Sequence, residues 1–138
     1  MKRSTRGQSL VELALLLPLL LLFLMIILDL GRAVYYYSVI HNAAREGARY
    51  GIVHYHNVTT SAALTASIIT TAKELAIGID PAELTISTPG IPVFPIETGD
   101  ILVVKADYRF SAVTPLVNLF IKDGFIDLSS TSTMYFEK

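Results

Sequence analysis

Gly7, Gln8 and Glu12 are the residues whose types and spacing suggest a chemical event, which is cleavage of the chain. They stand between a short basic leader and a long apolar run, and the basic residues of the leader are Lys2, Arg3 and Arg6. A peptidase that cut after Gly7 would make Gln8 the new N-terminus and Glu12 the fifth residue of the mature chain. Because the small residue precedes the apolar run, this cut would leave the apolar helix on the mature protein.

The leader must be compared with an ordinary secretory signal, which also has a basic start and an apolar core. Such a signal is cleaved at small residues just after its core. Here the core is followed by Asp29-Leu30-Gly31-Arg32, which fits that site poorly. The sequence therefore favours a cut before the apolar run, at Gly7.

The apolar run predicts a membrane-spanning helix in contact with lipid. Leu13 to Leu28 (LALLLPLLLLFLMIIL) carries no charge and extends over roughly 24 Å as a helix, less than the ~30 Å of a bilayer core. Leu10 to Leu30 extends over about 31 Å and includes Glu12 and Asp29, one acid near each interface. We therefore expect a basic leader over residues 1–7 and a transmembrane helix over residues 8–31.

The distribution of charge predicts the orientation of this helix. Three basic residues precede the span and only Arg32 follows it closely. This bias places the N-terminus in the cytoplasm and the C-terminal domain outside the cytoplasmic membrane. A net charge of −1 gives no electrostatic basis for binding nucleic acid, and a chain without cysteine has no thiol or disulfide chemistry.

Glu12 is an acid inside a membrane segment, and such a residue calls for a functional partner. A carboxylate at the bilayer centre costs about 2.5–3.5 kcal/mol on insertion scales, and less near an interface. After cleavage the obvious partner is the free amino group of Gln8 on a neighbouring chain, which would neutralise both charges. An alternative is a capping box at Ser9-Leu10-Val11-Glu12, but that motif does not account for Gly7 or the basic leader.

The far end of the span carries a candidate membrane boundary. Asp29 and Arg32 are three residues apart and can pair on one face of a helix. Three consecutive tyrosines point around a helix rather than along one face, which favours an interfacial aromatic belt. These residues are Tyr35, Tyr36 and Tyr37.

The same helix is expected to continue outside the membrane over residues 32–56. This stretch has no proline, and apolar or small residues recur at spacings of three and four. Two glycines in a helix each cost about 1 kcal/mol relative to alanine, so a close approach to a sheet is expected, although fraying near Gly51 is an alternative. The small residues expected to pack are Ala43, Ala44, Gly47, Ala48 and Gly51.

Residues 57–138 are expected to form an α+β globular domain with a three-stranded, antiparallel sheet packed on the long helix. A second helix is predicted over Ser61–Ile77, between hydroxyl residues and Gly78. The clearest strand is Ile101–Phe110, where apolar and charged residues alternate. The remaining predictions are strands at Leu84–Ser87 and Ile126–Phe136, an exposed loop at Pro89–Gly99, and a short helical turn at Thr114–Phe120.

No catalytic or cofactor-binding constellation is expected. His54 and His56 have no cysteine or nearby acid to complete a metal site, so no metal site is predicted. Asn57-Val58-Thr59 matches the N-glycosylation pattern, which is a weak signal. The sequence contains no phosphate-binding loop and no defensible nucleophile–base spacing, so an enzyme and a cofactor are not predicted.

Two stretches resemble a known family. Gly7-Gln8 with Glu12 resembles the cleavage motif of type IV prepilins. Leu30-Gly31-Arg32-Ala33 and the stretch His41 to Arg49 (HNAAREGAR) are similar to TadE-like proteins, which are minor pilins (pseudopilins) of the tight-adherence, or Flp, pilus. The resemblance extends from Gly7 to about Gly51 and implies a pilin-like fold.

The resemblance also implies a function and partners. The chain would be processed by a prepilin peptidase at Gly7 and Gln8, with Glu12 as the acidic recognition residue. It would then join or prime a pilus through contacts of its N-terminal helix with other pilin subunits and with a membrane assembly platform. The alternatives left open are the principal subunit of a type IV-like filament and a signal-anchored envelope protein with an extracytoplasmic binding domain.

Overall fold

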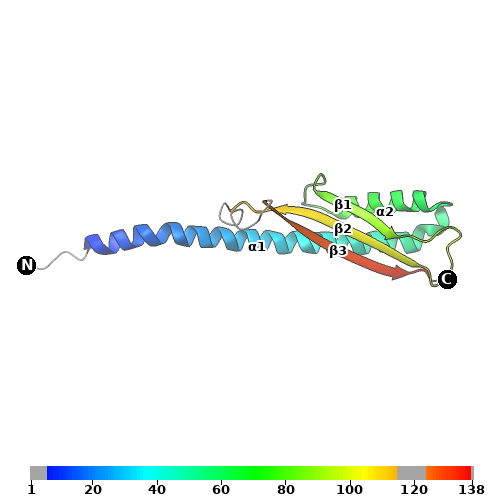
Figure 1. Ribbon diagram of the computed structural model, residues 1–138, viewed down its shortest axis with the longest axis horizontal. Coiled ribbons are helices and arrows are strands. Elements are labelled where there is room, and N and C mark those ends of the chain that lie inside the picture. The colour runs from blue at the N-terminus through cyan, green and yellow to red at the C-terminus, as the bar shows by residue number, and fades with distance from the viewer. Residues whose placement is uncertain (1–5, 115–123, 138) are drawn as a thin grey trace, which may run out of the picture. The chain divides into compact units, whose positions relative to one another are not determined.

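The computed structural model describes residues 6–114 and 124–137 of the chain. The elements follow one another as α1, the short 3-10 helix η1, α2, β1, β2 and β3 (Figure 1). The chain forms two compact units, each described by itself: residues 1–33 with 111–125, and residues 34–110 with 126–138. The α+β fold expected from the sequence is confirmed, with two main helices and a three-stranded antiparallel sheet.

The long helix α1 extends from Arg6 to His54 without interruption, although it contains Pro18. Its bounds exclude fraying at Gly51. They also place Ser9 inside the helix rather than in front of it, so the capping box considered at Ser9–Glu12 does not start α1. The 3-10 helix η1 follows at Tyr55–Asn57.

The second helix α2 extends from Ser61 to Leu75. It begins where the Thr60 side chain accepts a hydrogen bond from the N–H of Ala63 at 3.2 Å, the usual way that a threonine satisfies a free N–H in the first turn. Its buried residues are Leu64, Ile68 and Ala72. Their spacing of four is that of a single apolar stripe on a helix.

The sheet has the order β1-β2-β3, with β1 at Leu84–Gly90, β2 at Ile101–Ser111 and β3 at Phe125–Tyr135. β1 and β2 are antiparallel, with Leu84 opposite Tyr108 and Ile86 opposite Ala106. The register shifts between Ser87 and Gly90. β1 continues to Gly90, into the loop that the sequence predicted at Pro89–Gly99, and β2 ends one residue later than predicted. β3 has its predicted length but begins and ends one residue earlier.

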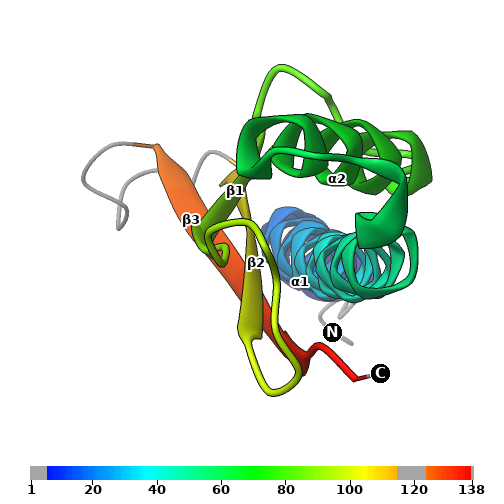
Figure 2. The same ribbon diagram turned by 90° about the vertical axis from the view of Figure 1, so that its right-hand side faces the viewer.

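The core of the second unit lies where α1, α2 and the sheet meet. Alternate residues of β2 are buried, as the alternation of apolar and charged residues predicts: Leu102, Val104, Ala106, Tyr108 and Phe110. Figure 2 shows α2 and the sheet on two different sides of α1. Residues 34–54 of α1 therefore need small side chains on two faces.

β3 carries hydroxyl side chains on both of its faces. Ser130 and Ser132 are buried on the inner face together with Phe136. The Ser130 Oγ lies 3.1 Å from Nδ1 of the exposed His41 on α1, so the buried hydroxyl has a polar partner. The predicted helical turn at Thr114–Phe120 lies, beyond Thr114, outside the described residues.

Candidate functional site

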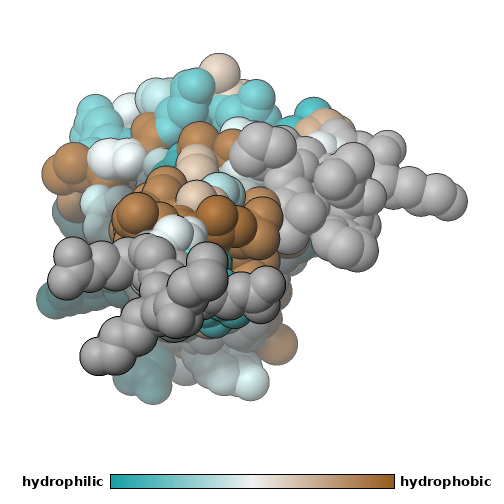
Figure 3. All heavy atoms as spheres, turned by 90° about the vertical axis from the view of Figure 1, so that its left-hand side faces the viewer, coloured by the Kyte–Doolittle hydropathy of each residue, from teal (hydrophilic) through white to brown (hydrophobic). Residues whose placement is uncertain are grey.

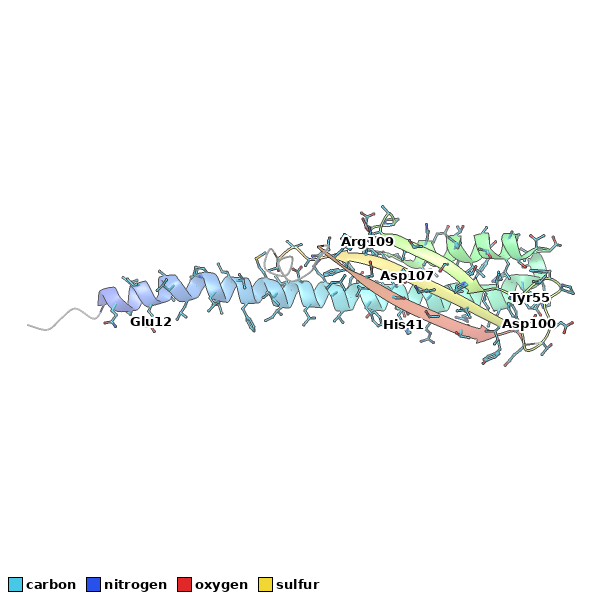
Figure 4. All side chains as sticks on the ribbon, viewed as in Figure 1. Glu12, His41, Tyr55, Asp100, Asp107 and Arg109 are labelled. Carbon is cyan, nitrogen blue, oxygen red and sulfur yellow. The ribbon has the colours of Figure 1, made fainter. Side chains whose placement is uncertain are left out.

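The predicted cleavage residues lie in the first turns of α1. Gly7, Gln8 and Glu12 are all exposed, and a Cβ added to Gly7 would have no atom within 4 Å. Glu12 points away from the helix (Figure 4), and within the described residues no ion pair is formed by its carboxylate. The glutamate and the peptide bond after Gly7 are both accessible.

The first half of α1 exposes large apolar side chains along its whole length. Between Leu10 and Leu30 most large apolar side chains are exposed, by 39% for Met25 to 73% for Leu15, and Leu22 and Ile26 are half-buried. Figure 3 shows apolar side chains gathered on the face of the molecule that it presents. A stable monomer in water rarely exposes such a long, continuous apolar surface. Of the described helices, α1 is the one long and apolar enough to cross a membrane, which makes it a candidate membrane anchor.

Asp29 is placed at the end of this apolar segment and is only 5% exposed. Its carboxylate accepts hydrogen bonds from the backbone N–H of Val113 at 3.1 Å and of Thr114 at 2.8 Å. Arg32 Nη1 donates to the same carboxylate at 3.0 Å. The Asp29–Arg32 pair expected from the sequence is present. The Asp29 carboxylate also holds the segment after β2 on the helix, through its bonds to Val113 and Thr114.

The two backbone bonds to Asp29 could not be found from the sequence. Val113 and Thr114 are 84 and 85 residues from Asp29, and no local pattern links a helical acid to a particular loop. The only available signal was that an acid at the end of an apolar run needs a partner. The sequence-based interpretation assigned Arg32, three residues later, as this partner.

The three consecutive tyrosines have three different surroundings. Tyr36 packs edge-on against Tyr108 and Phe110 of β2, with ring centroids 5.3 and 5.7 Å away. The Tyr35 hydroxyl donates to the carbonyl of Ile77 at 3.4 Å, and the Tyr37 ring stacks on His41. These contacts lie within the second unit. Tyr35 and Tyr37 remain about half exposed, at 51% and 48%, and the interfacial belt suggested by the sequence stays a prediction.

The small residues of α1 lie where the helix approaches both α2 and β2. Ala43, Ala44 and Ala48 have no exposed surface. A Cβ on Gly47 would lie 3.0 Å from Ala72 Cβ and 3.6 Å from Val104 Cγ1. A Cβ on Gly51 would lie 2.8 Å from Ile68 Cδ1 and would also clash with Leu102 Cδ2. A side chain at residue 51 would therefore force the ends of Ile68 and Leu102 to shift.

The polar residues of the same stretch lie on the exposed side of α1. Arg45 and Asn42 are exposed, and Glu46 forms a long, solvent-exposed ion pair with Arg49 at 3.7 Å. An exposed pair of this kind contributes little to stability. Packing thus explains the small residues of His41–Arg49 and leaves its charged residues without a structural role inside the unit.

The two histidines considered for a metal site, His54 and His56, contact aromatic side chains. His54 stacks on Tyr50 and His56 contacts Tyr55. In the described part of the chain no group of three histidine or acidic side chains is arranged to hold a metal ion. Asn57, the residue of the glycosylation pattern, is exposed at the end of η1.

Residues 7–49 match the family model described as TadE-like protein. The match begins at the predicted cleavage site and ends at Arg49, so it covers the exposed apolar segment and most of the small-residue stripe. It confirms the resemblance of these residues to TadE-like proteins, whereas cleavage after Gly7 stays a prediction. No curated protein and no solved structure matches the chain.

Proposed function

We propose that this chain, whose residues 7–49 match the TadE-like family model, is a Tad-pilus-associated protein and acts as a minor pilus subunit cleaved after Gly7. The observation that carries the proposal is the exposed apolar half of α1 with one acid near its start. Before assembly this segment lies in the lipid of the cytoplasmic membrane. In the pilus it packs against the corresponding helices of other subunits.

Glu12 has a specific part in this assembly. Cleavage after Gly7 creates a positive amine at Gln8, one turn before Glu12 on the helix. An acid among packed apolar helices costs several kcal/mol unless it is paired. The amine of a neighbouring subunit supplies the pair, so the acid favours one axial register between helices over others.

A simple membrane anchor would need neither cleavage after Gly7 nor a partner for Glu12. A matched set of variants separates the two functions. Gly7→Val blocks a peptidase that needs a small residue before the cut, whereas Gln8→Ala retains that residue and removes only the side chain after it. Neither change alters the positive leader or the apolar run.

The experiment measures the intact mass of the membrane-extracted protein, made with and without a prepilin peptidase. We expect wild type and Gln8→Ala to lose residues 1–7 only in the presence of the peptidase, and Gly7→Val to keep them. A full-length mass for the wild type under both conditions would refute processing and leave the envelope anchor as the better account.

A second candidate function is the principal subunit of the filament, since an exposed apolar helix would serve it equally well. The compact unit formed by residues 34–110 and 126–138 favours the minor role, because the principal subunits of these pili are much smaller. Shearing cells and quantifying this chain against total pilin decides between them: a minor subunit forms a small fraction of the sheared protein, and a principal subunit most of it.

A further inference from the structure

The segment after β2 is held against the end of the apolar part of α1. Residues 1–33 and 111–125 belong to one compact unit, so the place where this segment meets the helix is defined. The backbone N–H groups of Val113 and Thr114 both donate to the Asp29 carboxylate, at 3.1 and 2.8 Å. These two bonds fix residues 113 and 114 at the level of Asp29 along α1.

The length of the helix places this contact near a membrane boundary. The exposed apolar side chains of the candidate membrane anchor extend from Leu10 to Leu30, and Leu20 lies at the middle of this range. Asp29 lies about 14 Å further along the helix, whereas half of a bilayer core measures about 15 Å. With Leu20 at the bilayer midplane, the segment after β2 meets α1 where the acyl chains end and the headgroups begin.

Backbone that is not helical needs a partner within the protein for its N–H groups at this depth, because lipid supplies none. The Asp29 carboxylate is the acceptor for two such groups. The carboxylate is itself buried and receives a third hydrogen bond from Arg32 Nη1 at 3.0 Å. One cluster of hydrogen bonds thus satisfies both the acid at the end of the span and the backbone that meets it.

The side chain of Val113 points outward from this cluster. Its neighbours Ala112 and Thr114 are buried, whereas Val113 is 63% exposed. A single exposed valine is ordinary on the surface of a soluble protein. This valine differs because the hydrogen bonds on its own N–H and on the next one hold it at the end of the exposed apolar part of α1, where lipid would cover both.

We propose that Val113 is a membrane-contact residue, which enters the leaflet at the Asp29 end of the span, and that Asp29 is the positioning residue that holds it there. The partner is the lipid surface, because an apolar side chain gains free energy by leaving water and its backbone N–H is already paired. A contact beside the helix gives the chain a second fixed point on the membrane, which restricts the tilt and depth of α1. This inference rests on the membrane anchorage that the proposed function assumes, and not on cleavage after Gly7.

The chain has no tryptophan, so one introduced tryptophan is a unique fluorescent probe. The full chain is placed in lipid nanodiscs whose lipids carry bromine, which quenches tryptophan, either near the headgroups (shallow) or near the chain ends (deep). Leu20→Trp marks the middle of the span, and Val113→Trp tests the contact. Val93→Trp is the matched control, at a valine of the second unit that is 84% exposed.

The order of quenching is the expected result. A side chain at the boundary lies roughly 5–10 Å inside the leaflet, so shallow bromine should quench Val113→Trp about twofold more than deep bromine. Leu20→Trp should show the reverse order, and Val93→Trp should be quenched by neither. If Val93→Trp is quenched as strongly as Val113→Trp, any exposed apolar probe adsorbs to lipid, and the assignment of Val113 is overturned.

The positioning role of Asp29 has its own readout. Asp29→Ala added to Val113→Trp removes the acceptor of both N–H groups, so shallow quenching should fall by about twofold or more. Asp29→Ala added to Leu20→Trp should leave deep quenching unchanged, because the apolar helix still spans the membrane. Shallow quenching of Val113→Trp that is the same with and without Asp29 would overturn this role.

A smaller probe covers the case in which tryptophan does not fit at residue 113. Val113→Cys introduces a side chain smaller than valine into a chain that has no cysteine. A polar maleimide should label Val113→Cys in nanodiscs at least about tenfold more slowly than Val93→Cys, because an apolar environment disfavours the reactive thiolate. Equal labelling rates would overturn the contact.

The Leu20→Trp measurement separates failure of this inference from failure of its premise. If deep bromine does not quench Leu20→Trp, α1 does not span the membrane, and the anchorage assumed in the proposed function ends together with this inference. If deep bromine quenches Leu20→Trp while neither bromine quenches Val113→Trp, only the inference ends.

Discussion

Gly51→Ala is the substitution that tests most sharply how α1 packs on the second unit. The new Cβ would lie 2.8 Å from Ile68 Cδ1 and closer still to Leu102 Cδ2. Both neighbours are the ends of flexible side chains, but Ile68 and Leu102 have no exposed surface, so neither can move into solvent. Overpacking a filled core costs about 1–3 kcal/mol.

Helix propensity acts in the opposite direction and must be measured separately. Replacing glycine by alanine inside a helix stabilises it by about 1 kcal/mol. The exposed Ser38 lies in the same segment of α1, so the difference between Ser38→Ala and Ser38→Gly measures this preference where no clash exists. After that correction, Gly51→Ala is expected to lower the free energy of unfolding by about 1–3 kcal/mol.

The assay is denaturant unfolding of the full chain in a non-ionic detergent, followed by near-ultraviolet circular dichroism of the tyrosines. Tyr36 and Tyr108 report the packing directly because their rings are in contact across the interface between α1 and β2. A second substitution, Leu102→Val, should relieve part of the clash and recover part of the lost stability. If Gly51→Ala gains as much stability as the Ser38 pair predicts, the close approach of α1 to β2 and α2 is not real.

Three further predictions concern individual side chains. Glu12→Ala molecules that have been cleaved after Gly7 should reach the sheared pilus fraction at a tenth or less of the wild-type amount, measured by immunoblot, because the loss of a buried ion-pair partner costs several kcal/mol; normal incorporation of the cleaved variant would contradict the pairing. Asp29→Ala should accelerate hydrogen exchange of the Val113 and Thr114 N–H groups by about tenfold or more, because each loses its acceptor; unchanged exchange would mean that the carboxylate does not hold this segment. Burial raises the pKa of the Tyr108 hydroxyl above its usual value, so its contribution to stability is complete below about pH 10 and is lost as the pH rises further; Tyr108→Phe should lose less stability than wild type over that alkaline range, and equal losses would contradict the shift.

Much of the fold was predictable because its elements carry simple periodic patterns. The alternation in Ile101–Phe110 identified β2 and its inward face, and the absence of proline after Arg32 indicated that α1 continues to His54. The glycines were informative for a physical reason. Since a helix interior disfavours them, Gly47 and Gly51 indicated a close approach before the partner was known.

The remaining features depend on contacts between distant parts of the chain. The tyrosines at residues 35–37 were interpreted from their place after an apolar run, which does not reveal that Tyr36 contacts Tyr108 and Phe110, more than seventy residues away. The buried Ser130 is likewise explained only by His41 on another element. Local patterns say which residues share a face, whereas the partner of that face is decided by the tertiary fold.

The central claim is that the apolar helix is retained after cleavage and that its acid meets a new amine on a neighbouring subunit. The most direct measurement treats the sheared pilus fraction with a hydrophobic carbodiimide, which joins an amine to an adjacent carboxylate, and identifies the cross-linked peptides by mass spectrometry. The account predicts a chain that begins at Gln8, with the Glu12 carboxylate joined through an amide to the N-terminal amine of another subunit. A pilus-associated chain that still begins at Met1, or one that lacks the segment from Leu10 to Leu30, would contradict it.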